Sequence, residues 1–283
     1  MLNLGNVTLC GVDTRTPDLA LQALKCSMRR IRFGAVILFS NSQPALCEQA
    51  AASGVKITDV GAINSIEDYS KFMVTGLADY IPTEFALVTQ WDGFVLNPQA
   101  WSDEFLQYDY IGALWRDKVG DRAVGNGGFS LRSKRLFNAL LGPDIVVTHP
   151  EDLCICDVNR ERLERNYGIR FAPPEVAAKF SYEHVRPTTP AFGFHGIFNL
   201  VDALSADEML AFTKEMTVGM AFGAGARQLA KSLVYSGQYE AARELLLKRI
   251  RGGDRRWRTL SLWMRMWLRQ QLGIKSQSVR ANS

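Results

Sequence analysis

The first 95 residues alternate short apolar segments with longer helix-like ones, and this alternation restricts the possible folds more than any other feature of the chain. One helix-like segment begins at Thr16-Pro17 and another at Ser65, with Asp68 in the capping-box position, and both are typical helix starts. Strands that alternate with helices in this way predict βαβ units and a mostly parallel central sheet. The expected strands are 7–13, 34–41, 55–61 and 84–95, and the expected helices are 16–31, 44–54 and 65–81.

Polar residues stand at the ends of these expected strands. Parallel strands joined by helices all point the same way, so Asp13, Asn41, Asp59 and Asp92 are expected along one edge of the sheet. Ligands of open α/β sheets bind at this edge. The most informative segment is 84–95, EFALVTQWDGFV, because it delivers Asp92 there at the end of a buried strand. The pattern does not specify the order of the strands.

Beyond residue 95 the elements become shorter and less regular. The expected elements are a strand at 110–115, a strand that turns into a helix at 129–141, and a helix at 149–168. The chain is expected to be helical from residue 205 onward, where 232–250 resembles one hairpin of a tetratricopeptide-type repeat. One copy cannot form a solenoid. The expected domains are therefore an α/β domain at 1–204 and a helical C-terminal extension at 205–283.

Composition restricts the environment of the chain. No run of roughly 18 apolar residues is present, and the N-terminus lacks a basic region, so neither a transmembrane helix nor a secretion signal is expected. The five cysteines are odd in number and irregularly spaced, which favours a reducing compartment. The expected location is cytoplasmic, with peripheral attachment to the inner face of the membrane as an option. The last residues, KSQSVRANS, are expected to form a frayed tail.

Positive charge is concentrated near the C-terminus. Residues 243–283 contain eleven Lys or Arg and two acids, which gives this segment +9 and leaves −5 for the remainder of a chain whose net charge is +4. A helix at 255–273 places three tryptophans on one broad apolar face with arginines on its flank, although Leu262 and Met266 break the separation. This composition is typical of an interfacial membrane anchor. The alternative is a helix docked on the catalytic domain or another subunit. Nucleic-acid binding is not expected, because no recognised module is present.

Asp92 and His195 are the candidate metal ligands. Hard oxygen ligands suit Mg²⁺ or Mn²⁺, and such ions keep one or two protein carboxylates while phosphates supply the other ligands. Gly193 and Gly196 allow a close backbone approach near His195. The alternatives are an Asp-Gly hairpin turn for Asp92 and a core histidine among neighbouring phenylalanines for His195.

Two further clusters are candidates for catalysis and binding. Glu151 and Asp152 begin an expected helix, where the helix dipole stabilises negative charge. Asp152 is interpreted as a general base that takes the proton of an acceptor hydroxyl, and Glu151 as a residue that positions the molecule carrying this hydroxyl. The alternative is that both acids only cap the helix. The run 125–128, GNGG, matches neither a Walker loop nor a dinucleotide fingerprint, and is interpreted as a substrate-binding loop with Asn126 as a hydrogen-bonding residue.

Six motifs taken together resemble one bacterial family. They are TQWDGFVLNP, YDYIGALW, VGNGGFSLRS, HPEDLCIC, IRFAP and FGFHGIFN. The family is known as domain of unknown function 5672 and is regarded as glycosyltransferase-like. The resemblance covers about residues 5–200 and implies a GT-A-type fold, a single nucleotide-binding α/β domain.

The resemblance also implies roles for individual residues. Enzymes of this type bind metal and diphosphate through an Asp-x-Asp motif, which Gln90 and Asp92 match here, so the first acid is an amide. One carboxylate could then suffice together with His195, or the enzyme could be independent of metal. The pair that carries the catalytic base is matched by Glu151 and Asp152. The strand edge that contacts the nucleoside in such enzymes is matched by Val12, Asp13, Thr14 and Arg15. Together with the residues expected at the sheet edge and in the glycine loop, the predicted donor-binding residues are Val12, Asp13, Thr14, Arg15, Asn41, Gln90, Trp91, Asp92, Asn126, Gly127 and Gly128.

Two functional hypotheses follow. The first is an inverting glycosyltransferase that uses a nucleotide sugar such as a UDP-sugar, with Mn²⁺ or Mg²⁺, and modifies a glycan or lipid-linked acceptor in surface-polysaccharide or glycolipid assembly. The second is a non-catalytic nucleotide- or glycan-binding module on the same fold, which the amide at Gln90 favours. A third and weaker hypothesis is a scaffold whose helical C-terminus recruits partners.

Overall fold

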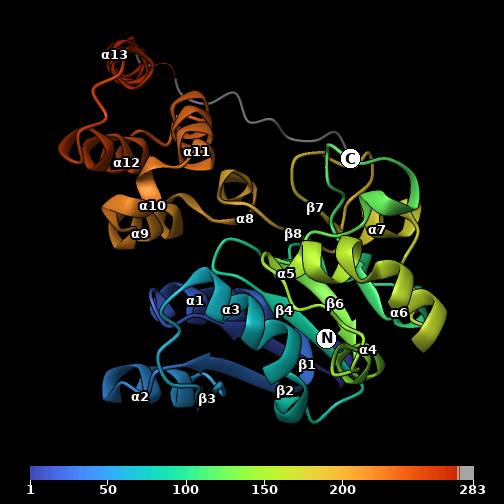
Figure 1. Cartoon of the computed structure of the whole chain (residues 1–283). Helices are drawn as coiled ribbons and strands as arrows, with labels where there is room; N and C mark the ends of the chain where they lie inside the picture. Colours follow the sequence, from blue (N-terminus) through green and yellow to red (C-terminus); the bar gives the residue numbers. More distant parts are fainter. Residues whose placement is uncertain (273, 275–283) are drawn as a thin grey trace. The chain divides into compact units, whose positions relative to one another are not determined.

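The computed structural model describes residues 1–272 and 274, and these form two compact units (Figure 1). The first unit is Met1–His195 and the second begins at Gly196. The predicted boundary after residue 204 therefore lies inside the second unit. The expected frayed tail at 275–283 lies outside the described residues.

A six-stranded sheet forms the centre of the first unit, in the order β3-β2-β1-β4-β6-β5. Its strands are β1 (Leu2–Val12), β2 (Ile31–Ser40), β3 (Lys56–Asp59), β4 (Phe85–Thr89), β5 (Tyr110–Gly112) and β6 (Phe129–Ser133). The first four strands run parallel, as predicted, whereas β6 is antiparallel to both of its neighbours, β4 and β5. A separate parallel pair joins β7 (Ser181–Tyr182) to β8 (Gly193–Phe194). The predicted fold class, α/β with a mostly parallel sheet and a helical C-terminal extension, is confirmed.

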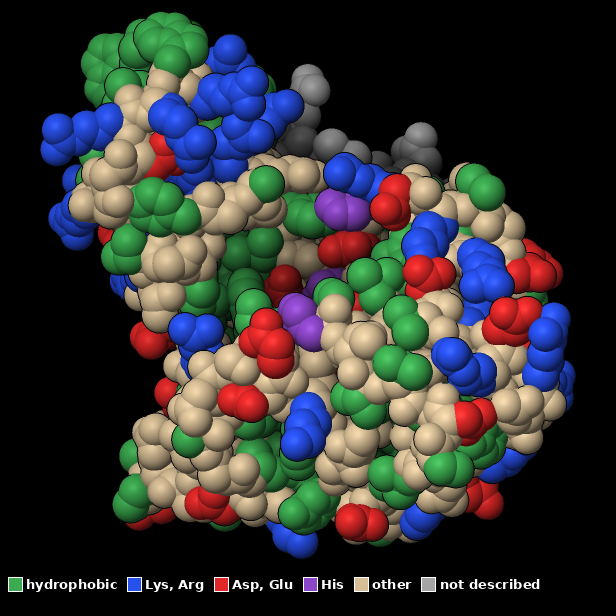
Figure 2. Space-filling view, viewed as in Figure 1, with side chains coloured by type: hydrophobic (Ala, Val, Ile, Leu, Met, Phe, Trp, Pro, Cys, Tyr) green, Lys and Arg blue, Asp and Glu red, His purple; other side chains and the backbone are tan. Residues whose placement is uncertain are grey.

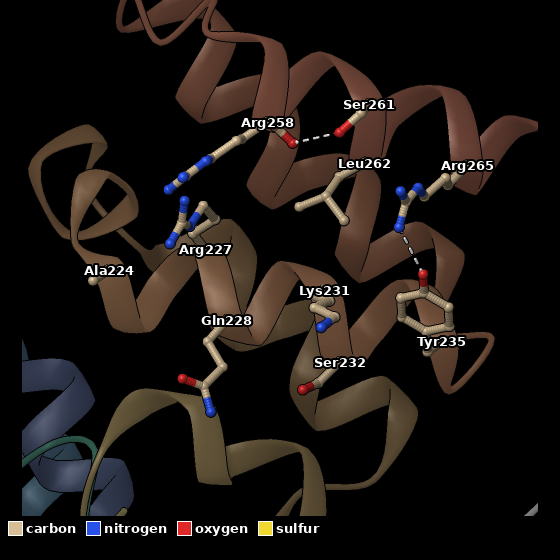
Figure 3. Close-up of a pocket in the computed structure, with 10 residues that line it drawn as sticks. All are labelled: Ala224, Arg227, Gln228, Lys231, Ser232, Tyr235, Arg258, Ser261, Leu262 and Arg265. Atoms are coloured by element: carbon tan, nitrogen blue, oxygen red, sulfur yellow. Dashed lines mark hydrogen bonds between the residues drawn. The ribbon is translucent and has the colours of Figure 1, made fainter.

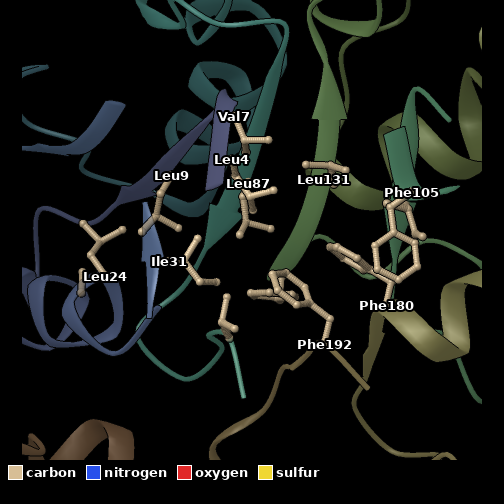
Figure 4. Packing of buried hydrophobic residues seen from close by; sticks show 14 of the residues in the cluster. Leu4, Val7, Leu9, Leu24, Ile31, Leu87, Phe105, Leu131, Phe180 and Phe192 are labelled. Atoms are coloured by element: carbon tan, nitrogen blue, oxygen red, sulfur yellow. The ribbon is translucent and has the colours of Figure 1, made fainter. Parts of the chain in front are cut away.

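Helices cover both faces of this sheet. The helices of the first unit are α1 (Pro17–Ser27), α2 (Pro44–Ala52), α3 (Ile66–Lys71), α4 (Lys134–Leu140), α5 (Glu151–Leu153), α6 (Arg160–Tyr167) and α7 (Pro174–Phe180). Successive strand residues point to opposite faces, so Leu9, Leu38 and Leu87 pack with α1, α2 and α7 in one core (Figure 4). Their neighbours Cys10 and Phe39 pack on the other face with the segment that follows α3.

The predicted helix at 65–81 is α-helical only at its start. The segment leaves α-helical geometry after Lys71, becomes π-helical at Phe72–Gly76, and ends in a short 3-10 turn. Glycine at position 76 leaves room for the Phe72 ring in this bend, because a Cβ there would lie 2.7 Å from the ring. The predicted capping box is present, since the Asp68 amide donates to the Ser65 hydroxyl over 3.0 Å and the Asp68 carboxylate accepts from the Ser65 amide.

Ser65→Ala is expected to lower the free energy of unfolding by about 1 kcal/mol, because it leaves an amide of the first turn of α3 without its acceptor. Urea denaturation followed by circular dichroism measures this loss. Ser261→Ala is the matched control: Ser261 bonds the Arg258 carbonyl within a helix and caps nothing, so its replacement is expected to be neutral. Equal stabilities for the two variants would contradict the assignment of the cap.

The second unit consists of helices. They are α8 (Leu200–Ala203), α9 (Ala206–Glu215), α10 (Val218–Phe222), α11 (Ala224–Tyr235), α12 (Tyr239–Arg251) and α13 (Trp257–Gln271). Asp254 fixes the start of α13, because its carboxylate accepts hydrogen bonds from Arg249, Arg256 and Thr259. Among the helices of the described residues, none combines the length and apolar character needed to cross a membrane.

Candidate active site

The end of β4 and the start of β6 meet at one edge of the sheet. Because β6 runs antiparallel to β4, Thr89 at the end of β4 pairs with Phe129 at the start of β6. One step beyond the strands, the Gln90 amide donates to the Gly128 carbonyl over 2.9 Å. The turn that carries Asp92 and the glycine loop therefore lie side by side. The strand order reverses here, between β1 and β4, and ligands of open α/β sheets bind at such a point.

The short strands β7 and β8 bring His195 to the same edge. Glu183 and His195 directly follow residues that pair between these two strands. His195 Nε2 lies 3.3 Å from Asp92 Oδ1 and 3.2 Å from Gln90 Oε1. On the other side of the ring, Nδ1 lies 3.4 Å from Glu183 Oε1. The structure thus brings the two predicted metal ligands, Asp92 and His195, into direct contact.

His195 carries a positive charge between two carboxylates. Burial alone would lower the pKa of its imidazole, but the contacts with Asp92 and Glu183 outweigh burial and raise this pKa to about 10. Burial would similarly raise the pKa of Glu183, yet the hydrogen bond and charge of His195 lower it. The mutual attraction of these charges holds the three side chains in one cluster.

Glycine is required where His195 lies against the loop before β6. A Cβ at Gly128 would lie 2.1 Å from His195 Nε2, and a Cβ at Gly93 would lie 2.8 Å from the Phe194 carbonyl oxygen. Gly125, Gly127 and Gly128 are not among the described glycines that have a positive φ. The glycines of this run therefore allow close packing and do not adopt left-handed backbone conformations.

Glu151 and Asp152 lie against the same loop at Gly127, the residue before Gly128. A Cβ at Gly127 would lie 2.3 Å from Glu151 Oε1 and 3.1 Å from Asp152 Cβ. Arg132 in β6 donates from Nη2 to Glu151 Oε1 over 2.8 Å, and its side chain is fully buried. Because Glu151 is already paired with a buried guanidinium, it is the less suitable of the two carboxylates for accepting a proton.

Asp152 is the carboxylate of this pair that can exchange a proton. Burial, followed by the negative charge of Glu151, raises the pKa of Asp152, and the hydrogen bond that Oδ1 accepts from the Leu153 amide over 2.8 Å offsets part of the rise. A carboxylate with a raised pKa is a stronger base. The geometry therefore favours Asp152 as a general base, with Glu151 and Arg132 as its support.

Asp13 has a structural role at the end of β1. Its Oδ1 accepts hydrogen bonds from the amides of Arg15 and Thr16 over 2.8 and 2.7 Å, and its Oδ2 accepts from the Thr16 hydroxyl over 2.8 Å. Thr16 was the predicted cap of α1, but its side chain makes no capping bond to the helix. Asp13 therefore caps the entry to α1, and this use occupies much of its acceptor capacity.

The remaining predicted nucleoside-binding residues stand at the ends of β1 and β2. Val12 is the buried last residue of β1, and the Thr14 hydroxyl donates to the Ile63 carbonyl over 3.3 Å. Arg15 is exposed. Asn41 Oδ1 accepts a hydrogen bond from the preceding serine over 3.3 Å. Because β1 pairs in parallel with both β2 and β4, these residues share the sheet edge with Asp92.

Asn126 and Trp91 complete the predicted set. Asn126 Nδ2 donates to Glu183 Oε2 over 3.2 Å, and its Oδ1 accepts from the Gly128 amide over 3.2 Å. It therefore joins the glycine loop to the carboxylate behind His195. Trp91 lies half-buried in the turn between Gln90 and Asp92.

Asp92 Oδ1 and Gln90 Oε1 both lie within 3.3 Å of His195 Nε2, so these three atoms are the candidate donors for the predicted metal. Gln90 Nε2 donates to the Tyr69 hydroxyl over 3.0 Å, which leaves Oε1 directed at His195. Glu183 contacts the other ring nitrogen of His195, Nδ1, and a carboxylate in this position orients a histidine that binds a metal through Nε2. Within residues 1–272 and 274, no three His, Cys, Asp or Glu side chains surround one metal position. The donors fit Mn²⁺ or Mg²⁺ if the amide and phosphate oxygens complete the set and His195 loses its proton.

Sequence reasoning missed three polar side chains of this site. Each contacts a predicted residue that is distant in the chain, so local patterns do not reveal it. The one available signal was a single charge within the apolar strand FSLRS, at 129–133. The missed residues are Tyr69, Arg132 and Glu183.

Comparison with known proteins adds a family and several distant structures. A family profile described as "Protein of unknown function (DUF5672)" matches residues 53–195. No curated protein matches the chain.

The solved structures with some similarity include three bacterial proteins. TarS residues 1–349 from S. aureus is 9% identical with a TM-score of 0.40, and the match covers 92% of this chain and 78% of TarS. The glycosyltransferase GlyE from Streptococcus pneumoniae is 10% identical with a TM-score of 0.39, covering 67% of this chain and 54% of GlyE. Glucosyl-3-phosphoglycerate synthase from Mycobacterium tuberculosis, in complex with Mn²⁺ and UDP, is 10% identical with a TM-score of 0.35, covering 47% of this chain and 58% of the synthase. A functional assignment therefore has to be argued from the site's own residues.

Proposed function

Because the chain belongs to DUF5672, a family of proteins of unknown function, we propose an activity from its site: transfer of a sugar from a nucleoside diphosphate donor to a hydroxyl acceptor. The observation that supports this most is the placement of two different clusters against adjacent glycines. His195, which contacts Asp92, lies at Gly128, and Asp152 lies at Gly127. The first cluster suits a diphosphate with its cation, and the second suits a hydroxyl that must lose its proton.

The proposed reaction assigns a task to each cluster. Asp92 and His195, together with the side-chain oxygen Oε1 of Gln90, would hold Mn²⁺ or Mg²⁺. A divalent cation there would stabilise the negative charge of a departing diphosphate. Asp152 accepts the proton of the acceptor hydroxyl as its oxygen attacks the anomeric carbon. The acceptor oxygen attacks from the face opposite the diphosphate while the bond from that carbon to the diphosphate breaks, so the configuration of the sugar inverts and the nucleoside diphosphate leaves. Arg132 neutralises Glu151 and keeps it from competing for the proton.

The nucleoside-binding edge and the classes of donor and acceptor are proposed from the same site. The parallel strands β1, β2 and β4 end at one edge, which suits a nucleoside bound in the manner of a GT-A-type domain. We take UDP-sugars as the first donors to test, and a glycan or lipid-linked hydroxyl, as in surface-polysaccharide or glycolipid assembly, as the acceptor. Release of UDP from a panel of UDP-sugars, with and without Mn²⁺, tests the activity directly.

Asp92→Asn is expected to weaken Mn²⁺ binding at least about tenfold, because an amide replaces the one carboxylate among the three donor atoms. Titration of Mn²⁺ into the protein with UDP, followed by thermal shift or calorimetry, measures the change without relying on turnover. Asp117→Asn, at an exposed position, is the matched control. Equal Mn²⁺ affinity for the two variants would contradict the metal position. Tight UDP binding without turnover of any donor would favour the alternative of a nucleotide-binding module.

A further inference from the structure

Helix α13 is held on the helical unit by one narrow stripe. Thr259, Leu262 and Met266 are its buried residues, and Leu262 and Met266 are the two that break the amphipathic pattern in the sequence. The broad apolar face faces away from the bundle: the exposed fraction of Trp257 is 73% and that of Trp267 is 55%. A group of exposed large apolar side chains on one helix marks an interaction surface.

A groove of about 780 Å³ lies between α11 and α13, beside this apolar face (Figure 3). None of the described residues that line it is acidic. Figure 3 shows Arg227 and Arg258 pointing toward each other from the two helices. Within the described part of the chain, neither guanidinium forms an ion pair with a carboxylate. The cationic residues that line the groove are Arg227, Lys231, Arg258 and Arg265.

This charge arrangement favours binding of an anion. Two guanidinium groups that face each other repel, and the repulsion becomes attraction when an anion lies between them. Arg265 Nη1 donates to the Tyr235 hydroxyl over 2.9 Å, which fixes one end of the groove. Arg258 and Arg265 are seven residues apart and so lie on the same side of α13. Figure 2 shows Lys and Arg side chains gathered next to hydrophobic ones on the surface formed by these helices.

We propose that the helical unit binds an anionic phospholipid surface, with a phosphate headgroup in the α11–α13 groove and the tryptophan face of α13 at the level of the acyl chains. Cations on the flank of an interfacial helix lie at headgroup depth while its apolar face is buried, which is the arrangement of these side chains. A lipid surface is favoured over a nucleic acid or a free phosphate because only the lipid also covers Trp257 and Trp267. The inference does not depend on the proposed sugar transfer.

Sedimentation of the full-length protein with vesicles tests the proposal. Vesicles that contain phosphatidylglycerol are expected to bind it, and vesicles of phosphatidylcholine alone are expected to bind it weakly. The double variant Arg227→Gln/Arg258→Gln is expected to lose roughly 25-fold in partitioning, since each cation at an anionic surface contributes about fivefold. The double variant Arg243→Gln/Arg251→Gln removes the same charge from exposed positions on α12 and is expected to stay close to the native protein.

The apolar face is tested separately with Trp257→Ser/Trp267→Ser, whose two side chains are exposed, so that folding is expected to be unchanged by circular dichroism. This variant is expected to lose vesicle binding as well. Equal losses for the two arginine double variants would overturn the proposal in favour of nonspecific charge. Unchanged binding of the tryptophan variant would also overturn it. Binding of inorganic phosphate or single-stranded DNA without binding of vesicles would assign the groove to those ligands instead.

Discussion

Arg132→Gln is expected to lower the free energy of unfolding by about 3–5 kcal/mol and to abolish turnover, because it leaves Glu151 buried without its cation. The guanidinium of Arg132 is fully buried and donates to Glu151 Oε1 over 2.8 Å. Its Nε donates to the Ser130 hydroxyl over 3.0 Å, and Nη2 lies 3.4 Å from the Gly127 carbonyl. The side chain therefore joins β6, the glycine loop and α5, and glutamine is too short to replace these contacts.

Urea denaturation at neutral pH measures this loss, and two further variants make it interpretable. Arg135→Gln removes an arginine whose side chain is 61% exposed and whose Nη1 lies 3.4 Å from Asp109, so a change below about 1 kcal/mol is expected. Arg132→Met combined with Glu151→Leu removes both buried charges and is expected to recover most of the stability without recovering turnover. If Arg132→Gln alone unfolds at the same urea concentration as the native protein, the ion pair does not stabilise the fold.

The first half of the sheet is predictable because its signal is local. From β1 to β4 a helix joins each apolar strand to the next, and this order predicts parallel strands and a shared edge. The direction of β6 is not predictable in the same way, because the sequence FSLRS has a similar apolar pattern in either direction. The reversal is decided by tertiary pairing with β4. It also determines the site, since it places the glycine loop beside the end of β4.

The predicted helix at 149–168 shows a second limit of local patterns. The segment begins as α5, becomes π-helical at Cys154–Val158, and resumes as α6. Asn159 stabilises the interruption, because its side-chain amide donates to the carbonyls of Val146 and Cys154 over 2.8 and 2.9 Å. Helical periodicity detects the apolar face of such a segment, but it does not detect a side chain that replaces the backbone donors.

The residues of the candidate site likewise differ in whether local sequence patterns predict them. Asp92 and His195 were identifiable because a glycine follows each of them directly, and Asp152 because it stands at an expected helix start. Glu183 and Tyr69 were not, since their importance lies in contacts with His195 and Gln90 across the fold. Residues that act through a distant partner leave no pattern in the local sequence.

Asp152→Asn is expected to reduce sugar transfer by about 10²–10⁴-fold, because asparagine keeps the shape of the side chain but cannot accept the proton of the acceptor hydroxyl. Turnover of the donor identified in the UDP-sugar screen measures the effect. Asp157→Asn is the matched control: this aspartate lies in the π-helical segment nearby, is 41% exposed, and pairs with Lys118 over 2.8 Å. The control is expected to retain turnover. Full activity in Asp152→Asn would place the general base elsewhere.

The same substitution is expected to stabilise the fold at neutral pH, which separates catalysis from folding. The pKa of Asp152 is raised above its ordinary value of 3.8 by burial and by Glu151, so the folded protein binds this proton more tightly than the unfolded chain does. The stability that Asp152 contributes is therefore fully present below its unfolded pKa and is lost as the pH rises through the folded pKa. Asparagine removes this loss and can still accept the Leu153 amide hydrogen bond. The free energy of unfolding of the variant, relative to that of the native protein, should consequently increase from acid to neutral pH, by about 1.4 kcal/mol for each unit by which the pKa is raised. Urea denaturation at a series of pH values measures this change. A variant that loses both turnover and stability would show instead that the Asp152 carboxylate holds the loop in place.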